Sequence, residues 1–111
     1  MTDKKRKKNL NVPDGIVDCV LDTDAYNEVD DQYAIAYLIK SKEKLNVKAI
    51  YAAPFSNGNY TTEEGMEASY NEINNLLTLA GEDVPVFKGS TTYLPDKQTP
   101  VFSEAARDLA D

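Results

Sequence analysis

The sequence predicts an α/β fold in which a parallel sheet is built from the pattern βαβαβ. Three short apolar segments are separated by two longer segments in which apolar residues recur at helical spacing. Polar stretches that contain glycine or proline punctuate the chain where the pattern changes. Helical connections of this length between short strands are typical of right-handed crossovers in a parallel sheet.

The first strand is expected over residues 16–21, a mostly apolar and β-branched segment that ends at Asp22. Its composition predicts a buried strand. The first helix is expected from Asp30 to about Lys44, where acidic side chains stand at the start and lysines at the end. Both ends suit the helix dipole.

The second strand is expected over residues 47–53, closed by Pro54, which cannot donate a hydrogen bond to a central strand pair. A second helix should follow Thr61, because Glu64 three residues later completes a capping box, and should end at Gly81. Its apolar residues recur at helical spacing and predict a core-facing stripe: Met66, Tyr70, Ile73, Leu77 and Ala80.

A short third strand is expected over residues 84–87, and another helix begins within residues 103–109. In sheets of this kind, ligands bind beyond the carboxyl ends of the strands. Acidic side chains follow the first predicted strand, and Asn57 and Asn59 follow the second. The two polar loops are therefore expected to meet at one edge of the sheet.

Length and composition indicate one globular domain. The chain has 111 residues, of which 41% are hydrophobic and 28% charged. Five of the twelve basic residues fall at positions 4–8, so we expect residues 1–12 to form a basic flexible tail and residues 13–111 to form the domain. The domain carries seven basic and eighteen acidic residues. Because this charge repels a phosphate backbone, nucleic-acid binding is disfavoured.

Cysteine content and hydropathy favour a cytoplasmic protein. Cys19 is the single cysteine, so it forms no internal disulfide and is expected to be a small buried hydrophobe. No stretch approaches the roughly 18 consecutive apolar residues of a membrane span. The basic run at positions 4–8 is not followed by the apolar region of a signal peptide. We therefore expect no membrane partner.

A cluster of acidic residues directly follows the first predicted strand. Five carboxylates lie within the segment 22–31: Asp22, Asp24, Glu28, Asp30 and Asp31. Two unit charges about 5 Å apart repel by roughly 3 kcal/mol at an effective dielectric constant near 20, so the cluster needs a cation or a shared proton. Ligand sets made of oxygen alone select Ca²⁺ or Mg²⁺. The alternative is a surface loop whose acids face water and favour the start of the next helix.

Two other kinds of site with spaced aspartates fit less well. An EF-hand loop that began at Asp22 would need Gly and Glu at its sixth and twelfth positions, where this chain has Asn27 and Tyr33. That interpretation is excluded. A haloacid-dehalogenase-like phosphotransferase also places two spaced aspartates after a strand, with the first as nucleophile, but typically has Thr or Val at the position of Tyr26. It remains a less favoured alternative.

The segment Asp22-Thr23-Asp24 and the later pair Asp30-Asp31, which opens an alanine-containing helix, resemble the N-terminal signature of a known family. This family is the calcium-dependent nucleoside hydrolases, the inosine-uridine-preferring nucleoside N-ribohydrolases. Further segments fall where the family has counterparts: residues 46–50, 63–80 and 83–89. The resemblance begins near Ile16 and covers the first third of a family member. It implies a truncated domain with a Rossmann-like open sheet.

The resemblance implies a glycosidase of nucleoside salvage, a hydrolase that cleaves the N-glycosidic bond of ribonucleosides with Ca²⁺-activated water. By motif position, Asp24 resembles the general base that also contacts Ca²⁺, and Asp31 resembles a second metal ligand. Asp30 would accept hydrogen bonds from the ribose hydroxyls. Asp22 would support the site from behind.

Asn57 is the best match to an asparagine that lies near the ribose in that family, and Asn59 is the alternative. This chain has Ala25-Tyr26 where the short family form has Pro-Gly, and two further residues before the aspartate pair. The remaining metal ligands and the leaving-group acid are expected beyond residue 111. A non-catalytic remnant that binds a cation weakly is therefore an alternative function. A small sheet with one uncovered face also predicts self-association of the chain.

Overall fold

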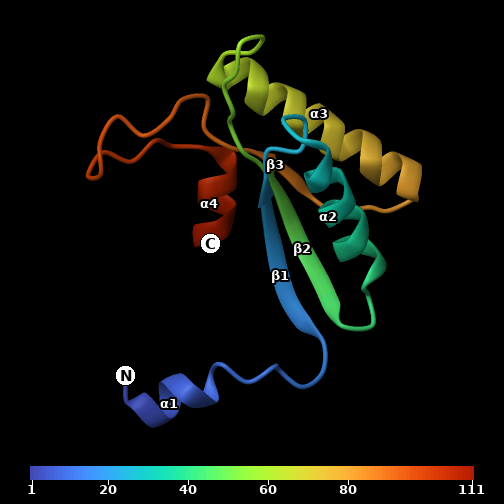
Figure 1. Cartoon of the computed structure of the whole chain (residues 1–111), viewed down its shortest axis with the longest axis vertical. Coiled ribbons are helices and arrows are strands. Elements are labelled where there is room, and N and C mark those ends of the chain that lie inside the picture. The colour runs from blue at the N-terminus through green and yellow to red at the C-terminus, as the bar shows by residue number, and fades with distance from the viewer.

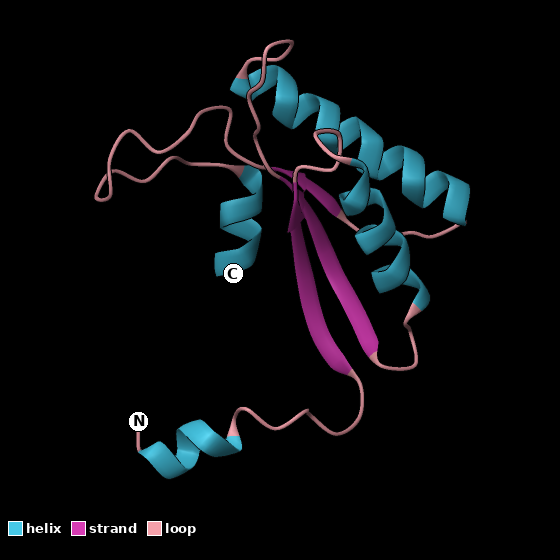
Figure 2. Cartoon of the chain, viewed as in Figure 1, coloured by secondary structure: helices cyan, strands magenta, loops and turns pink.

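Strands and helices alternate along the computed structural model, which describes residues 1–111 (Figure 1). The elements in chain order are α1 (Asp3–Lys8), β1 (Val17–Thr23), α2 (Val29–Lys40), β2 (Leu45–Ala52), α3 (Thr62–Ala80), β3 (Val86–Lys88) and α4 (Glu104–Ala110). The segment from β1 to β3 confirms the predicted βαβαβ pattern, and Figure 2 shows the helices α2, α3 and α4 beside the sheet.

The three strands form one parallel sheet in the order β1-β2-β3. An α/β fold with a parallel sheet is therefore confirmed. The paired residues at the strand ends are Val17 with Leu45 and Thr23 with Ala52 for the first pair of strands, and Ile50 with Val86 and Ala52 with Lys88 for the second. Because all strands run in one direction, the loops that follow β1 and β2 leave the sheet at the same edge.

Helices α2 and α3 cover one face of the sheet and bury the main core (Figure 1). Its buried residues are Ala25, Ile35, Ile39, Ile50, Ala52, Met66, Ile73 and Leu77. The predicted stripe on α3 is confirmed as core, with Tyr70 and Ala80 partly buried against this cluster. The core thus fixes both crossover helices and, through Ala25, the start of the loop after β1.

The ends of α3 follow the sequence signals. Thr61 and Glu64 form the predicted capping box, in which the Thr61 backbone N–H donates to the Glu64 carboxylate at 2.9 Å. Gly81 ends the helix with a φ of 68°, in the left-handed region that glycine adopts readily. Near the start of α3, Gly65 lies so close to the loop after β2 that a Cβ there would be 2.1 Å from the Phe55 carbonyl oxygen. The helix therefore packs directly against that loop.

Two element boundaries differ from the prediction. Helix α2 ends at Lys40 instead of about Lys44, because Ser41 donates its hydroxyl to the Tyr37 carbonyl and the chain turns there into β2. Strand β3 begins at Val86 instead of residue 84, because Pro85 has no N–H to donate to the ladder. Both shifts are local and leave the sheet order unchanged.

The second face of the sheet is only partly covered, by α4. Ala105 of this helix packs against Ala49 and Tyr51 of β2. Strand β1 is an edge strand of the sheet, and its Val20 side chain remains 41% exposed. The prediction of a buried first strand is therefore wrong, since burial alternates along β1, and Cys19 is half-buried instead of buried. An uncovered sheet face agrees with the reasoning behind self-association, which stays a prediction.

The N-terminal segment lies apart from the sheet (Figure 1). It includes the short helix α1, which the sequence did not predict and which buries no residue. Thr2 caps it, and an ion pair of 2.9 Å joins Arg6 to Asp3. None of the helices has the combination of length and apolar content needed to cross a membrane.

Candidate functional site

The loop between β1 and α2 holds Asp24 in a short hydrogen-bonded turn. The backbone N–H of Asn27 donates to the Asp24 carbonyl at 2.8 Å, and the Asn27 side-chain amide donates to the Asp24 carboxylate at 3.1 Å. Ala25 between them is fully buried and anchors the turn in the core. The turn therefore fixes the Asp24 carboxylate at the carboxyl edge of the sheet.

Asp30 and Asp31 lie in the first turn of α2, where the positive end of the helix dipole favours carboxylates. Asp31 accepts a hydrogen bond from the hydroxyl of Thr23, the last residue of β1. Thr23 is buried, so this contact joins the end of the strand to the start of the helix. Asp30 is exposed. The helix thus presents one tethered and one free carboxylate.

Asp22 faces away from the core side of the sheet. It pairs in register with Tyr51 and lines a cavity of about 270 Å³ together with Ser90 and Ser103. Although the residue as a whole is exposed, its carboxyl group is partly covered, and this burial raises the pKa of Asp22, with a smaller contribution from the charge of Asp24. None of the other four predicted site residues lines this cavity.

Asn57 lies in the loop after β2, and its side chain organises that loop. The side-chain oxygen accepts hydrogen bonds from the backbone N–H groups of Asn59 at 2.9 Å and Tyr60 at 3.1 Å. Its amide donates to the Asn27 side-chain oxygen at 3.5 Å, a long hydrogen bond. The structure therefore brings Asn57 and Asp24 together through Asn27, whereas Asn59 contributes only its backbone.

Asn27 is the residue that the sequence reasoning missed. The available signal was its position three residues after Asp24, a spacing at which asparagine and aspartate side chains stabilise turns. Its contact with Asn57 joins loops thirty positions apart. Such a contact cannot be read from local sequence, because it depends on how the two strands pair.

Aromatic side chains complete the contact between the two loops. The ring of Tyr26 meets that of Tyr60 edge to face, with centroids 5.8 Å apart and planes at 73°. Tyr60 in turn packs on Phe55 at 5.7 Å. Phe55 is buried and Tyr26 is half-exposed. The row of rings therefore runs from the core to the surface beside Asp24.

The acidic side chains suit a hard cation in kind but form no compact group. Their oxygen donors are the ligand type that Ca²⁺ prefers, and Ca²⁺ takes six to eight of them. No set of three or more acidic side chains converges closely enough to hold a metal ion. Asp24 and Asp31 each have one carboxylate oxygen engaged by a neighbour, Asn27 and Thr23 respectively.

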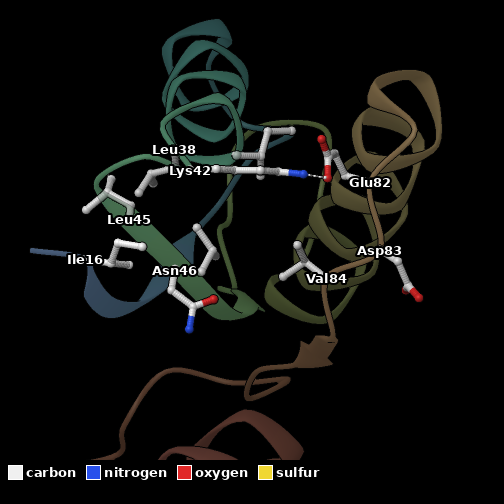
Figure 3. Close-up of a pocket in the computed structure, with 10 residues that line it drawn as sticks. Ile16, Leu38, Lys42, Leu45, Asn46, Glu82, Asp83 and Val84 are labelled. Carbon is white, nitrogen blue, oxygen red and sulfur yellow. Dashed lines mark hydrogen bonds and ion pairs between the residues drawn. The ribbon is translucent and has the colours of Figure 1, made fainter.

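A separate groove of about 410 Å³ opens at the opposite, amino-terminal edge of the sheet (Figure 3). Apolar side chains such as Leu38 and Leu45 line it. On its rim the Lys42 ammonium donates to the Glu82 carboxylate at 2.5 Å, and this contact lowers the pKa of Glu82. None of the predicted site residues reaches this groove. Ligands of parallel sheets bind at the carboxyl edge, so we place the candidate site there.

Comparisons of the chain with protein-family models, with curated proteins and with solved structures found no match. A functional assignment therefore rests on the residues and contacts described above.

Proposed function

We propose that the carboxyl edge of this sheet is the ribose-binding part of a nucleoside hydrolase, with the Rossmann-like open sheet of that family. The observation that carries the proposal is the chain of contacts from Asp24 through Asn27 to Asn57. It joins the two residues that the family resemblance selects independently, one from each loop.

In this proposal the chain's own groups divide the work of binding and proton transfer. Asp24 accepts a proton from the attacking water, and its turn holds the carboxylate ready for that role. Asp30, exposed at the start of α2, accepts hydrogen bonds from the ribose hydroxyls. The anionic surroundings stabilise the positive charge that develops on the ribosyl group as the glycosidic bond breaks.

Asp24 and Asp31 are the residues that would hold Ca²⁺. When bound, the cation supplies acidification of a water molecule at neutral pH. The role of Asp22 is to shape the site from the other face of the sheet, where it lines its own cavity.

The non-catalytic alternative has one observation in its favour: the acidic side chains do not form a group of three. We accordingly expect no measurable hydrolysis of inosine or uridine by this chain alone, even with millimolar Ca²⁺. A reducing-sugar assay checks this, with Asp24→Ala as the control for contaminating enzyme. Turnover that disappears in the control would show that the residues of this chain suffice for catalysis.

Binding of a nucleoside tests the proposal directly. Inosine is titrated into the ¹⁵N-labelled chain at millimolar Ca²⁺, and the backbone amide signals are followed by NMR. We expect the signals of Asp24, Asp31 and Asn57 to shift together, and the shifts to be lost in Asp24→Ala. Asp14→Ala, an exposed acid at the opposite edge of the sheet, is the matched control and should bind as the parent does. Shifts confined to the groove at the amino-terminal edge would refute the proposal.

A further inference from the structure

Three aromatic rings lie beside the acidic loop, and the proposed roles of the carboxylates give them no function. Phe55 is only 3% exposed and belongs to the interior, so it fixes Tyr60 from below. Tyr26 is 49% exposed and touches Tyr60 edge to face. The half-exposed Tyr26 ring thus contacts a ring that packs on the buried Phe55.

Of the exposed tyrosines, Tyr26 alone takes part in a ring pair. Tyr33 and Tyr37 on α2 are more exposed, at 73% and 74%, and neither takes part in a ring pair. The Tyr26–Tyr60 pair, by contrast, bridges the same two loops as the polar contact between Asn27 and Asn57.

Polar groups and aromatic rings lie next to each other at the carboxyl edge of the sheet. Tyr26 follows Asp24 by two residues, and the backbone N–H of Tyr60 donates to the Asn57 side chain at 3.1 Å. Carboxylate and amide oxygens therefore lie on the same two loops as the aromatic pair. A ligand that carries hydroxyl groups next to a planar ring could use both.

We infer that the Tyr26–Tyr60 pair is the wall against which the planar ring of the ligand stacks. The inference rests on the proposed function, in which that ring is the purine or pyrimidine base of a ribonucleoside. Stacking on an aromatic side chain tolerates any base, since every base has a π face, so this wall contributes affinity more than base selection. Tyr26 is the exposed member and carries the contact, while Tyr60 positions it.

The test compares inosine with methyl β-D-riboside, which keeps the sugar and lacks the base. Both are titrated into the chain at millimolar Ca²⁺, with the tyrosine ring signals and the loop amides followed by NMR. Inosine should shift the ring signals of Tyr26 and Tyr60, and the riboside should shift only the loop amides. Tyr26→Ala should weaken inosine binding roughly tenfold, within the range known for base stacking, and leave the riboside unaffected.

Controls separate stacking from a general effect of losing a tyrosine. Tyr37→Ala removes a ring that is more exposed than that of Tyr26 and should not change inosine binding. Tyr26→Phe keeps the ring and should bind inosine as the parent does. Parental inosine binding by Tyr26→Ala would overturn the inference while leaving the proposed function intact. Ring shifts without any shift of the Asp24, Asp31 and Asn57 amides would support the aromatic site and overturn the proposed function. Absence of both sets of shifts would overturn both.

Discussion

Replacement of Gly65 by alanine should destabilise the chain, although alanine is the better helix former. Gly65 lies near the start of α3, where a methyl group would be 2.1 Å from the Phe55 carbonyl oxygen and 3.0 Å from the Phe55 carbonyl carbon. Heavy atoms in ordinary contact are at least about 3.4 Å apart. The helix or the loop must therefore move by roughly 1 Å to admit the methyl group.

Two opposing terms set the size of the effect. Helix propensity favours Gly65→Ala by about 1 kcal/mol. Overpacking against an anchored neighbour costs about 1–3 kcal/mol, and here the upper part of that range applies because the obstacle is backbone and Phe55 is buried. We expect a net loss of about 1–2 kcal/mol in the free energy of unfolding. For a chain of this size, each kcal/mol lowers the Tm by roughly 4–8 °C.

Urea denaturation followed by circular dichroism measures the loss, and Gly58→Ala is the matched control. Gly58 lies in the same loop as Phe55, and a methyl group there would have no other atom within 4 Å. Its φ is not positive either, so the replacement should change stability by less than about 0.5 kcal/mol. The Asn57 and Tyr60 amides should also shift in Gly65→Ala, since the displaced loop carries them. A Gly65→Ala chain as stable as the parent, or more stable, would refute the close packing of α3 on this loop.

Four further substitutions probe other parts of the molecule. The pKa of Asp22 is raised in the folded chain, so its stabilising contribution is complete below the ordinary carboxyl pKa of roughly 3.9 and is lost as the pH rises through the folded value. Asp22→Asn should therefore gain stability relative to the parent between acidic and neutral pH in denaturation curves. An equal pH dependence of the two chains would contradict this. Tyr51→Phe removes the hydroxyl that donates to Asp108 at 2.7 Å and joins β2 to α4. It should lower the free energy of unfolding by about 1 kcal/mol and reduce the hydrogen-exchange protection of α4. Unchanged protection of α4 would count against the contact. Asp24→Ala and Asp31→Ala should each abolish the weak Ca²⁺ binding expected of the chain in an NMR titration, and binding like that of the parent in both variants would show that the metal assignment is wrong.

The sequence predicted those parts of the fold that depend on local chemistry. The start of α3 follows from Thr61 and Glu64, because a capping box satisfies backbone groups within four residues, and its end follows from Gly81. The order of strands and helices also follows from the change between apolar runs and helical spacing. These signals need no knowledge of distant contacts.

The exposure of β1 could not be predicted in the same way. A run of β-branched residues indicates a buried strand whether one face of the strand is covered or both. The exposure of Val20 depends on how much of that sheet face α4 covers, and the sequence of β1 does not determine this. The end of α2 was missed because Ser41 competes for the Tyr37 carbonyl, an effect that helix propensity alone does not include.

In the candidate site, too, the features set by chain order could be predicted and the contacts between distant loops could not. Aspartates that directly follow a strand mark the carboxyl edge of a parallel sheet, so the approximate position of Asp24 and Asn57 was predictable from their order in the chain. The bridge through Asn27 and the ring pair of Tyr26 with Tyr60 were not predictable, because each joins two loops that meet only when β1 and β2 pair.

Comparison of inosine with 2′,3′-dideoxyinosine tests the central claim most directly. The two ligands share the base and differ only in the 2′ and 3′ hydroxyls, the ribose groups from which Asp30 is proposed to accept hydrogen bonds. At millimolar Ca²⁺, inosine should shift the Asp24, Asp31 and Asn57 amides, and dideoxyinosine should leave them in place at the same concentration. Equal shifts of these amides with both ligands would show that the carboxyl edge does not recognise ribose, and would contradict the proposed nucleoside hydrolase site.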